Sequence, residues 1–355
     1  MKKIITTLLV VLVGFSLTAC TAGDKGAEIA LITDVGTIDD GSFNQGSFEG
    51  VKQYGDEHDV TYDYYRPAIE DDEAYYDEIS KAIKDGGAKV VVTPGFLFEK
   101  AVYRAQNDFP DVHFVFLDGA PKDNDGNEAI GDNTYSVLYE EHQAGFLAGY
   151  AAVHEGFEKL GFIGGMKVPA VERFGIGFVK GADVAAKELN KKIEMHFNYA
   201  DAFVPTPEVQ ALAAGWYASG TEVIFSAAGG ANNSVFAAAE AAEAKTIGVD
   251  VDQYDVSETV VTSAMKELQL SVYEALTLHF DDKFPGGTQY TYSVKDNGVG
   301  LSHKFDRFEN FTEEQYKAIY KRLVENESGL LESIPRTHEA DFSDHTFENI
   351  ELILN

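Results

Sequence analysis

Short apolar runs alternate with amphipathic stretches along most of the chain. In the first third, runs rich in β-branched and aromatic residues predict strands at 28–33, 60–65, 89–93 and 112–117. The stretches between them predict helices at 43–57, 72–84 and 99–107. Because strands that alternate with helices form a parallel sheet covered on both faces, this pattern predicts a doubly wound α/β unit.

The same alternation begins again after residue 132. We expect a long helix at 136–153 and a last helix at 267–280. Between them the pattern predicts strands at 160–163, 193–199, 222–226, 245–249 and 259–263, separated by helices at 171–189, 206–217 and 232–242. The chain should therefore form two three-layer lobes of similar make, although no sequence repeat relates them.

The residues that follow the predicted strands are the candidates for a site. Ligands of open α/β sheets bind beyond the carboxyl ends of the strands. Carboxylates, glycines and phenylalanines recur there in both halves, at Asp34, 94–96, 118–119, 164–165, Asp201, Phe203, 228–230 and Asp250. We therefore expect a cleft between the lobes that these groups line. Asp39 and Asp40 are better explained as loop and helix-start residues, because acidic side chains suit a helix N-terminus.

The first residues predict export from the cytoplasm. Lys2 and Lys3 precede an apolar stretch, residues 4–19, that is short for a membrane span and ends in small residues before Cys20. This resembles a bacterial lipobox, with residues 1–19 as the signal peptide, Cys20 as the acylated N-terminus and residues 20–26 as a flexible tether. The alternative is an ordinary signal peptide with an incidental cysteine. The expected location is the outer face of a bacterial cell membrane.

Composition and motifs exclude several classes of protein. A net charge of −31 argues against nucleic acid as a partner, and a single cysteine allows no intrachain disulfide. The nine histidines are scattered without an HExxH motif, and neither an EF-hand loop, a GxSxG elbow nor a phosphate-binding GxxxxGK[ST] loop is present. We therefore expect no metal site, no cofactor and no enzymatic activity.

The stretch TDVGTIDDGSFNQ (33–45), placed after the first strand of a lipobox protein, resembles the basic membrane protein family of substrate-binding lipoproteins, the purine nucleoside receptors that feed ABC importers. FVFLDG (114–119), EHQAGFLAGYAA (141–152) and GFIGGMKVPAVERFGIGFVKG (161–181) resemble family segments in the expected order. The resemblance implies a type I periplasmic-binding fold with the ligand between the lobes. Lobe I would hold residues 27–133 and about 256–295, lobe II about 134–255, and the segment 296–355 would pack across both.

A nucleoside offers a flat base and adjacent ribose hydroxyls, and this chemistry assigns roles to the candidate residues. Stacking on aromatic faces suits the base. Phe43 is the first stacking candidate. The resemblance implies a second phenylalanine across the cleft, and Phe203 and Phe174 compete for that position, with Phe203 favoured because it follows a strand end. For polar contacts we expect Asp34, Asn44 and Asp118 at the base edge, Asp250 and Lys266 at the ribose, and the backbone of Gly229 and Gly230 close to the ligand.

The resemblance implies that the protein captures a nucleoside, with a purine base expected, and delivers it to the permease subunits of an ABC importer. Its lipid anchor would hold it at the membrane. The alternative is a ligand-sensing surface receptor or antigen of the same fold that binds a sugar or another small molecule.

Overall fold

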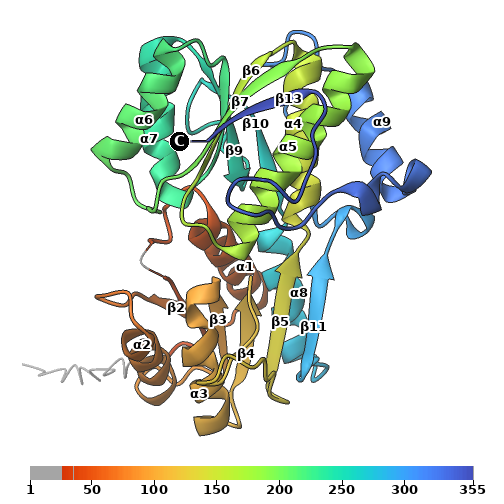
Figure 1. The fold of residues 1–355 in the computed structure, drawn as a ribbon. Coiled ribbons are helices and arrows are strands. Elements are labelled where there is room, and N and C mark those ends of the chain that lie inside the picture. The colour runs from red at the N-terminus through yellow and green to blue at the C-terminus, as the bar shows by residue number, and fades with distance from the viewer. Residues whose placement is uncertain (1–25, 35, 355) are drawn as a thin grey trace, which may run out of the picture.

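The structure is a computed structural model that describes residues 26–34 and 36–354 (Figure 1). The predicted signal peptide, Cys20 and most of the predicted tether lie outside these residues. The described chain forms two α/β lobes that lie one above the other in Figure 1, each with its own sheet. The two-lobed, doubly wound architecture predicted from the sequence is confirmed. Across the described residues, no helix is both long and apolar enough to cross a membrane.

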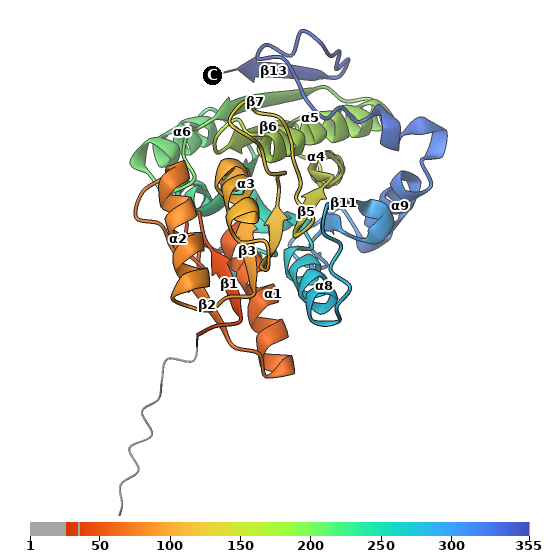
Figure 2. The ribbon, with the colours of Figure 1, turned by 90° about the horizontal axis from the view of Figure 1, so that it is seen from below.

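Lobe I is built on a six-stranded sheet with the order β11-β5-β4-β3-β1-β2, in which every pairing is parallel. The strands are β1 (Ile29–Ile32), β2 (Tyr62–Tyr65), β3 (Val90–Pro94), β4 (His113–Leu117), β5 (Thr134–Tyr139) and β11 (Thr288–Tyr292). The helices that cover the two faces are α1 (Phe43–His58), α2 (Asp72–Lys84), α3 (Glu99–Asp108) and α8 (Leu268–Phe280). In Figure 2, α1 and α8 lie together on one face, and α2 and α3 lie on the other.

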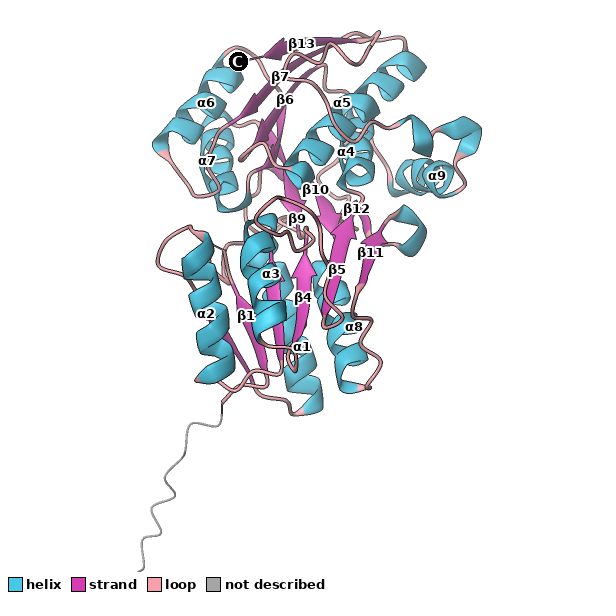
Figure 3. Cartoon of the chain, turned by 60° about the horizontal axis from the view of Figure 1, so that its bottom comes forward, coloured by secondary structure: helices cyan, strands magenta, loops and turns pink. Residues whose placement is uncertain are grey.

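Lobe II is built on a seven-stranded sheet with the order β12-β10-β9-β8-β6-β7-β13. The strands are β6 (Lys159–Gly164), β7 (Ile193–Tyr199), β8 (Val223–Ala227), β9 (Lys245–Asp250), β10 (Val260–Lys266), β12 (Val299–Leu301) and β13 (Ile350–Leu354). The helices are α4 (Glu141–Glu155), α5 (Pro169–Leu189), α6 (Pro207–Ala218), α7 (Asn232–Ala242) and α9 (Glu313–Val324). Figure 3 shows the two sheets meeting where their strands point toward one another.

Central strands that are buried on both faces are continuous apolar runs, as parallel sheets require. The runs IALI in β1 and VIFSA in β8 are fully buried. The helices begin at residues that suit a first turn. Thr206 accepts a hydrogen bond from Val209 N at the start of α6, and Pro169 occupies the first turn of α5.

Helices α4 and α5 approach closely enough that glycine is required between them. A Cβ atom on Gly145 would lie 2.2 Å from the carbonyl oxygen of Phe174, and one on Gly181 would lie 1.9 Å from that of Phe146. Both distances are far below van der Waals contact, so any side chain at these positions would force the helices apart. This packing places the N-terminal ends of both helices at the junction between the lobes.

The structure corrects the predicted helix at 136–153. Residues Thr134–Tyr139 form strand β5, which pairs with β4 and β11, and the helix begins only at Glu141. The sequence TYSVLY is apolar enough to fit either pattern, and periodicity alone does not separate a short buried strand from the start of a helix. Its β-branched and aromatic residues favour the strand once two neighbours are available to pair with it.

The sheets also correct the predicted lobe boundaries. The chain leaves lobe I after Tyr139 rather than near residue 133, and returns to it after Lys266 rather than near residue 256. Strand β10 belongs to lobe II because it pairs in parallel with β9, from Val260 opposite Thr246 onward. A third crossing joins β11 to β12, close to the predicted position near residue 295.

The C-terminal segment packs on lobe II and the hinge, not across both lobes as predicted. Strand β12 pairs with β10, and β13 adds to the outer edge of the sheet beside β7. The buried carboxylate of Glu155, at the end of α4, accepts hydrogen bonds from the backbone nitrogens of residues 309–311 at 2.7–2.9 Å. These contacts fix the segment to the body of lobe II before α9 begins.

Candidate ligand-binding site

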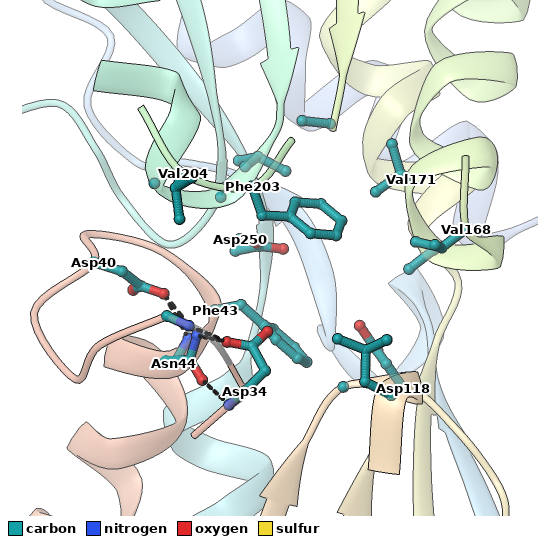
Figure 4. A pocket seen from close by; sticks show the side chains of 18 of the residues that line it. Asp34, Asp40, Phe43, Asn44, Asp118, Val168, Val171, Phe203, Val204 and Asp250 are labelled. Carbon is teal, nitrogen blue, oxygen red and sulfur yellow. Dashed lines mark hydrogen bonds between the residues drawn. The ribbon is translucent and has the colours of Figure 1, made fainter. Parts of the chain in front are cut away.

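A cavity of about 330 Å³ lies between the lobes, at the carboxyl ends of the strands. All nine residues predicted to bind ligand line it: Asp34, Phe43, Asn44, Asp118, Phe174, Phe203, Gly229, Asp250 and Lys266. Five of them belong to lobe II or to its connecting loops, so neither lobe forms the site alone. Figure 4 shows the cavity with Asp34, Phe43 and Asp118 below and Phe203 and Asp250 above.

Strand ends position most of these side chains. Asp34 follows β1 by two residues, Asp118 directly follows β4, and Asp250 and Lys266 are the last residues of β9 and β10. Asp118 and Asp250 both adopt left-handed backbone conformations, with φ of 61° and 66°. Such conformations are uncommon outside glycine and concentrate at functional sites, and here they turn each carboxylate out of its strand toward the cavity.

The start of α1 organises a network of three polar side chains. Asp40 caps the helix, because its carboxylate accepts from the backbone nitrogens of residues 42, 44 and 45 at 2.8–3.2 Å. The amide of Asn44 donates to Asp40 Oδ2 and to Asp34 Oδ1, each at 2.9 Å, and Asn44 Oδ1 accepts from Asp34 N. The structure therefore bears out the interpretation of Asp40 as a helix-start residue, and it ties Asp34 to the same helix (Figure 4).

Asp34 has an unusual acidity. Burial raises its pKa to about 6, although hydrogen bonds from Gly36 and Asn44 act in the opposite direction. The negative charges of Asp40 and Glu70 add to the rise. The carboxylate is therefore largely ionised at neutral pH but titrates only slightly below it, and perturbed groups of this kind are typical of functional sites.

Lys266 lies at the inner end of the cavity among three carboxylates, and 2 % of its side chain is exposed. Its Nζ is 2.6 Å from Asp118 Oδ2, 3.4 Å from Asp250 Oδ1 and 3.8 Å from Glu141 Oε1. Burial alone would lower the pKa of Lys266, but these three carboxylates raise it above its usual value, so the ammonium stays charged. The ammonium also lies 4.3 Å from the centre of the Phe43 ring.

Behind this cluster lies an ion pair that the sequence did not reveal. Glu141, the first residue of α4, is fully buried, and its Oε2 accepts from Arg173 Nε of α5 at 2.5 Å. Burial raises the pKa of Glu141, against the attraction of Arg173. Glu141 follows β5 by two residues, but the helix predicted at 136–153 concealed that strand end. Arg173 lies within α5, so only the packing of α4 against α5 brings the two side chains together beside Lys266.

Two hydrogen bonds join the lobes across the cleft, away from the hinge strands. Ser42 of lobe I donates through Oγ to Asp250 Oδ2 at 2.7 Å, and Gln253 of lobe II donates through Nε2 to the carbonyl of Gly41 at 2.8 Å. The amide of Gln253 also accepts from Asn232 at the start of α7. The lobes are therefore in contact in this structure, with the cavity between them.

The two candidates for the second stacking aromatic differ in their surroundings. Phe203 is half-buried, packs against Gly165 and points from lobe II into the cavity, across from Phe43 (Figure 4). Phe174 also lines the cavity, but it is only 2 % exposed and packs edge-on against Phe225 in the core at 5.9 Å. This geometry leaves the ring of Phe203 more available to a flat ligand than that of Phe174.

Gly95, expected at the cleft from its place after β3, lines the cavity between the strands that carry Asp34 and Asp118. Arg66 also lines it and was not assigned to it from the sequence. It follows β2 directly, so the same rule could have found it. The side chains of Val168, Val171 and Val204 add apolar surface from lobe II (Figure 4).

The cavity thus combines apolar and aromatic walls with a few carboxylates and one buried ammonium. No group of three or more histidine, cysteine or acidic side chains that could hold a metal ion occurs among residues 26–34 and 36–354. Such an arrangement is suited to holding a flat, neutral molecule that also carries hydrogen-bonding groups.

Comparisons with known proteins agree on one family. The family described as ABC transporter substrate-binding protein PnrA-like matches residues 27–332. An ABC transporter nucleoside-binding protein of Lactococcus lactis is 30% identical, over 86% of this chain and 88% of its own. A protein of Listeria monocytogenes called CD4+ T-cell-stimulating antigen is 28% identical, over 85% of this chain and 87% of its own.

Solved structures show the same fold. A solute-binding protein of an ABC transporter system from Aeropyrum pernix superposes with a TM-score of 0.71 and 23% identity, covering 86% of this chain and 88% of its own. At this identity the likeness concerns the fold, which is the two-lobed α/β fold of periplasmic solute-binding proteins. The family and these structural neighbours are binding proteins and not enzymes.

Proposed function

Since the chain belongs to the PnrA-like family of ABC transporter substrate-binding proteins, we propose that it captures a purine nucleoside between its lobes and delivers it to an ABC importer. One observation carries the proposal. Phe43 of lobe I and Phe203 of lobe II face the cavity from opposite sides, so closure of the lobes would sandwich a planar base between two aromatic rings (Figure 4).

The polar groups of the cavity divide into two sets that fit the two halves of a nucleoside. Asp34 and Asn44 lie at the start of α1 and would face the base edge. Asp118, Asp250 and Lys266 form the inner cluster and would take the ribose hydroxyls, which can donate to carboxylates while Lys266 balances their charge. The sequence suggested Asp118 for the base edge, and its contact with Lys266 makes it a member of the inner cluster as well.

The N-terminal sequence supports delivery from the membrane surface. Cys20 would be acylated and would anchor the body outside the cytoplasm, with residues 20–26 as the tether. Two acyl chains on one cysteine give stable attachment, whereas a single chain does not. The lobes would present the closed, loaded form to the permease subunits, as hinge closure around a ligand changes the surface on both sides of the cleft.

The proposal is tested by isothermal titration of the purified chain, unfolded and refolded to strip bound ligand, against purine and pyrimidine nucleosides and ribose. We expect saturable one-to-one binding of purine nucleosides. Phe43→Ala should weaken it by about 1–3 kcal/mol through loss of stacking. Silence toward every nucleoside from protein whose refolding is verified would rule the proposal out and favour another ligand in the same cavity.

A further inference from the structure

Two carboxylate oxygens of lobe I at the cavity, one on Asp118 and one on Asp34, accept no hydrogen bond from the described residues. Asp118 has a side chain that is only 7 % exposed, and its Oδ2 accepts from Lys266 at 2.6 Å. Its other oxygen, Oδ1, is buried and has no hydrogen-bond partner within the described residues. Figure 4 shows this carboxylate directed into the cavity. A buried anionic oxygen without a donor is costly, so a ligand that supplies one gains the corresponding free energy.

Asp34 presents a second carboxylate oxygen without a hydrogen-bond donor. Its Oδ1 accepts from Gly36 N at 2.6 Å and from Asn44 Nδ2 at 2.9 Å. Its Oδ2 receives no hydrogen bond from residues 26–34 or 36–354, and it faces the space beside Gly95. The pKa of Asp34 is raised to about 6 by burial, so this oxygen is mostly an anionic acceptor at pH 7.5.

The two donors that contact these carboxylates, Asn44 and Lys266, are already engaged. An amide NH₂ group has two hydrogens, and Asn44 uses both on Asp34 and Asp40. The opposite orientation of the amide would place its oxygen against two carboxylate oxygens, so the assignment is determined by the neighbours. The ammonium of Lys266 is likewise surrounded by carboxylates.

Gly95 keeps the floor between the two acceptors open. Strand β3 lies between β1 and β4, and the residue after it, Gly95, has a φ of 109°. A Cβ atom there would lie 3.7 Å from the Phe43 ring and 3.9 Å from Asp34 Oδ2, inside the space that a base stacked on Phe43 would use. Asp34 Oδ2 therefore lies beside the space that a base stacked on Phe43 would use, and Asp118 follows the strand on the other side of β3.

We propose that the cleft recognises the base through N–H donors on its edge and therefore selects 6-oxopurine nucleosides, above all guanosine, over adenosine. This inference rests on the proposed function. Guanosine carries N1–H and a 2-amino group on one edge, enough donors for two carboxylates. Adenosine has one amine beside the N1 lone pair, which would face a carboxylate oxygen. Sites built to bind an N–H reject analogues that lack it far more strongly than sites that only match shape.

Titration of the refolded full-length chain at pH 7.5 with four ligands tests the donor rule. The ligands are guanosine, 7-deazaguanosine, 1-methylguanosine and adenosine. 7-Deazaguanosine lacks the N7 acceptor and should bind within about threefold of guanosine, whereas 1-methylguanosine and adenosine should each bind at least about tenfold more weakly. The rule would be overturned if 7-deazaguanosine lost binding while 1-methylguanosine kept it. It would also be overturned if adenosine and guanosine bound with equal affinity.

A variant separates the donor rule from crowding by the added methyl group. Asp34→Asn replaces an acceptor oxygen with an amide that can donate to N1 of adenosine, so the preference for guanosine over adenosine should fall at least about threefold. Asp59→Asn is the matched control, because Asp59 is exposed at the end of α1 and outside the cavity. An unchanged preference in Asp34→Asn would refute the inference, while silence toward all nucleosides would refute the proposed function with it.

Discussion

The buried ammonium of Lys266 gives the sharpest test of the site's energetics. Replacing it with methionine keeps much of the side-chain volume but removes an ammonium that lies within 3.8 Å of Asp118, Asp250 and Glu141. At an effective dielectric constant of about 20, a unit charge at 3.4 Å contributes about 5 kcal/mol of attraction, offset by desolvation. Removal of one partner from a buried ion pair costs about 3–5 kcal/mol, and we expect Lys266→Met to reach the upper end.

Unfolding in urea, followed by the fluorescence of the single tryptophan, Trp216, measures this change within lobe II. Lys304→Met is the matched control. Its ammonium is also close to two carboxylates, at 2.7 Å from Asp255 and 3.2 Å from Asp252, but at an exposed position where water screens the charges. The urea midpoint of the Lys304→Met variant should therefore stay close to that of the unmodified protein.

A second substitution identifies the cause of the loss. In the double variant Lys266→Met with Asp118→Asn, one of the unpaired carboxylates becomes neutral, so part of the lost stability should return. If Lys266→Met unfolds at the same urea concentration as Lys304→Met, or if Asp118→Asn makes the loss larger, the reasoning about the buried cluster is refuted.

Three further outcomes follow from the same geometry. A ligand that donates a hydrogen bond to ionised Asp34 should lower the raised pKa of this carboxyl, about 6 in the free protein, so binding releases a proton. Nucleoside affinity should therefore fall about tenfold from pH 7 to pH 5. Equal affinities at the two pH values, or a similar fall in the Asp34→Asn variant, would contradict this. Phe203→Ala should weaken nucleoside binding with little change in the urea midpoint of unfolding. Phe174→Ala should instead lower the free energy of unfolding by about 3–5 kcal/mol, because Phe174 is buried in the core. If Phe174→Ala weakens binding and Phe203→Ala lowers stability, the stacking belongs to Phe174. In Glu155→Gln, one of the two oxygens that accept from the backbone of the C-terminal segment becomes an NH₂ donor. Backbone hydrogen exchange over residues 309–324 should then become faster, while exchange in α7 stays the same. Unchanged exchange over 309–324 would count against Glu155 as the anchor of the segment.

Several elements were predictable to the residue because their signals are local. The helix predicted at 232–242 is α7 and the strand predicted at 193–199 is β7. An alanine-rich run has high helix propensity whatever surrounds it, and an apolar run bounded by polar residues has few alternatives to a strand. The edge strand β2 was predicted, but the edge strands β11, β12 and β13 gave no such signal. β11 is mostly exposed and lacks an apolar face, so its sequence resembles a loop until β5 is beside it.

The site followed from one rule that the sequence can supply. Carboxyl ends of parallel strands meet at one edge of a sheet, so Asp34, Asp118 and Asp250 could be assigned to a common cleft from their positions alone. Whether each binds ligand stays a prediction until titration. The same rule is silent about Arg173, which lies within α5, and it missed Glu141, the first residue of α4, because strand β5 was predicted as helix. The packing of α4 against α5 brings the two together.

The sequence by itself determined most of the strands and helices up to residue 280, and several of the polar residues at the strand ends, because both depend on neighbours a few positions away. Only the tertiary structure decided that β10 belongs to lobe II, that both amide hydrogens of Asn44 are donated to Asp34 and Asp40, and that Lys266 is surrounded by carboxylates. These outcomes depend on contacts between residues far apart in the chain. Hydrogen-bond partners and buried charges are fixed by such contacts, so the chemistry left free for a ligand is a property of the folded molecule.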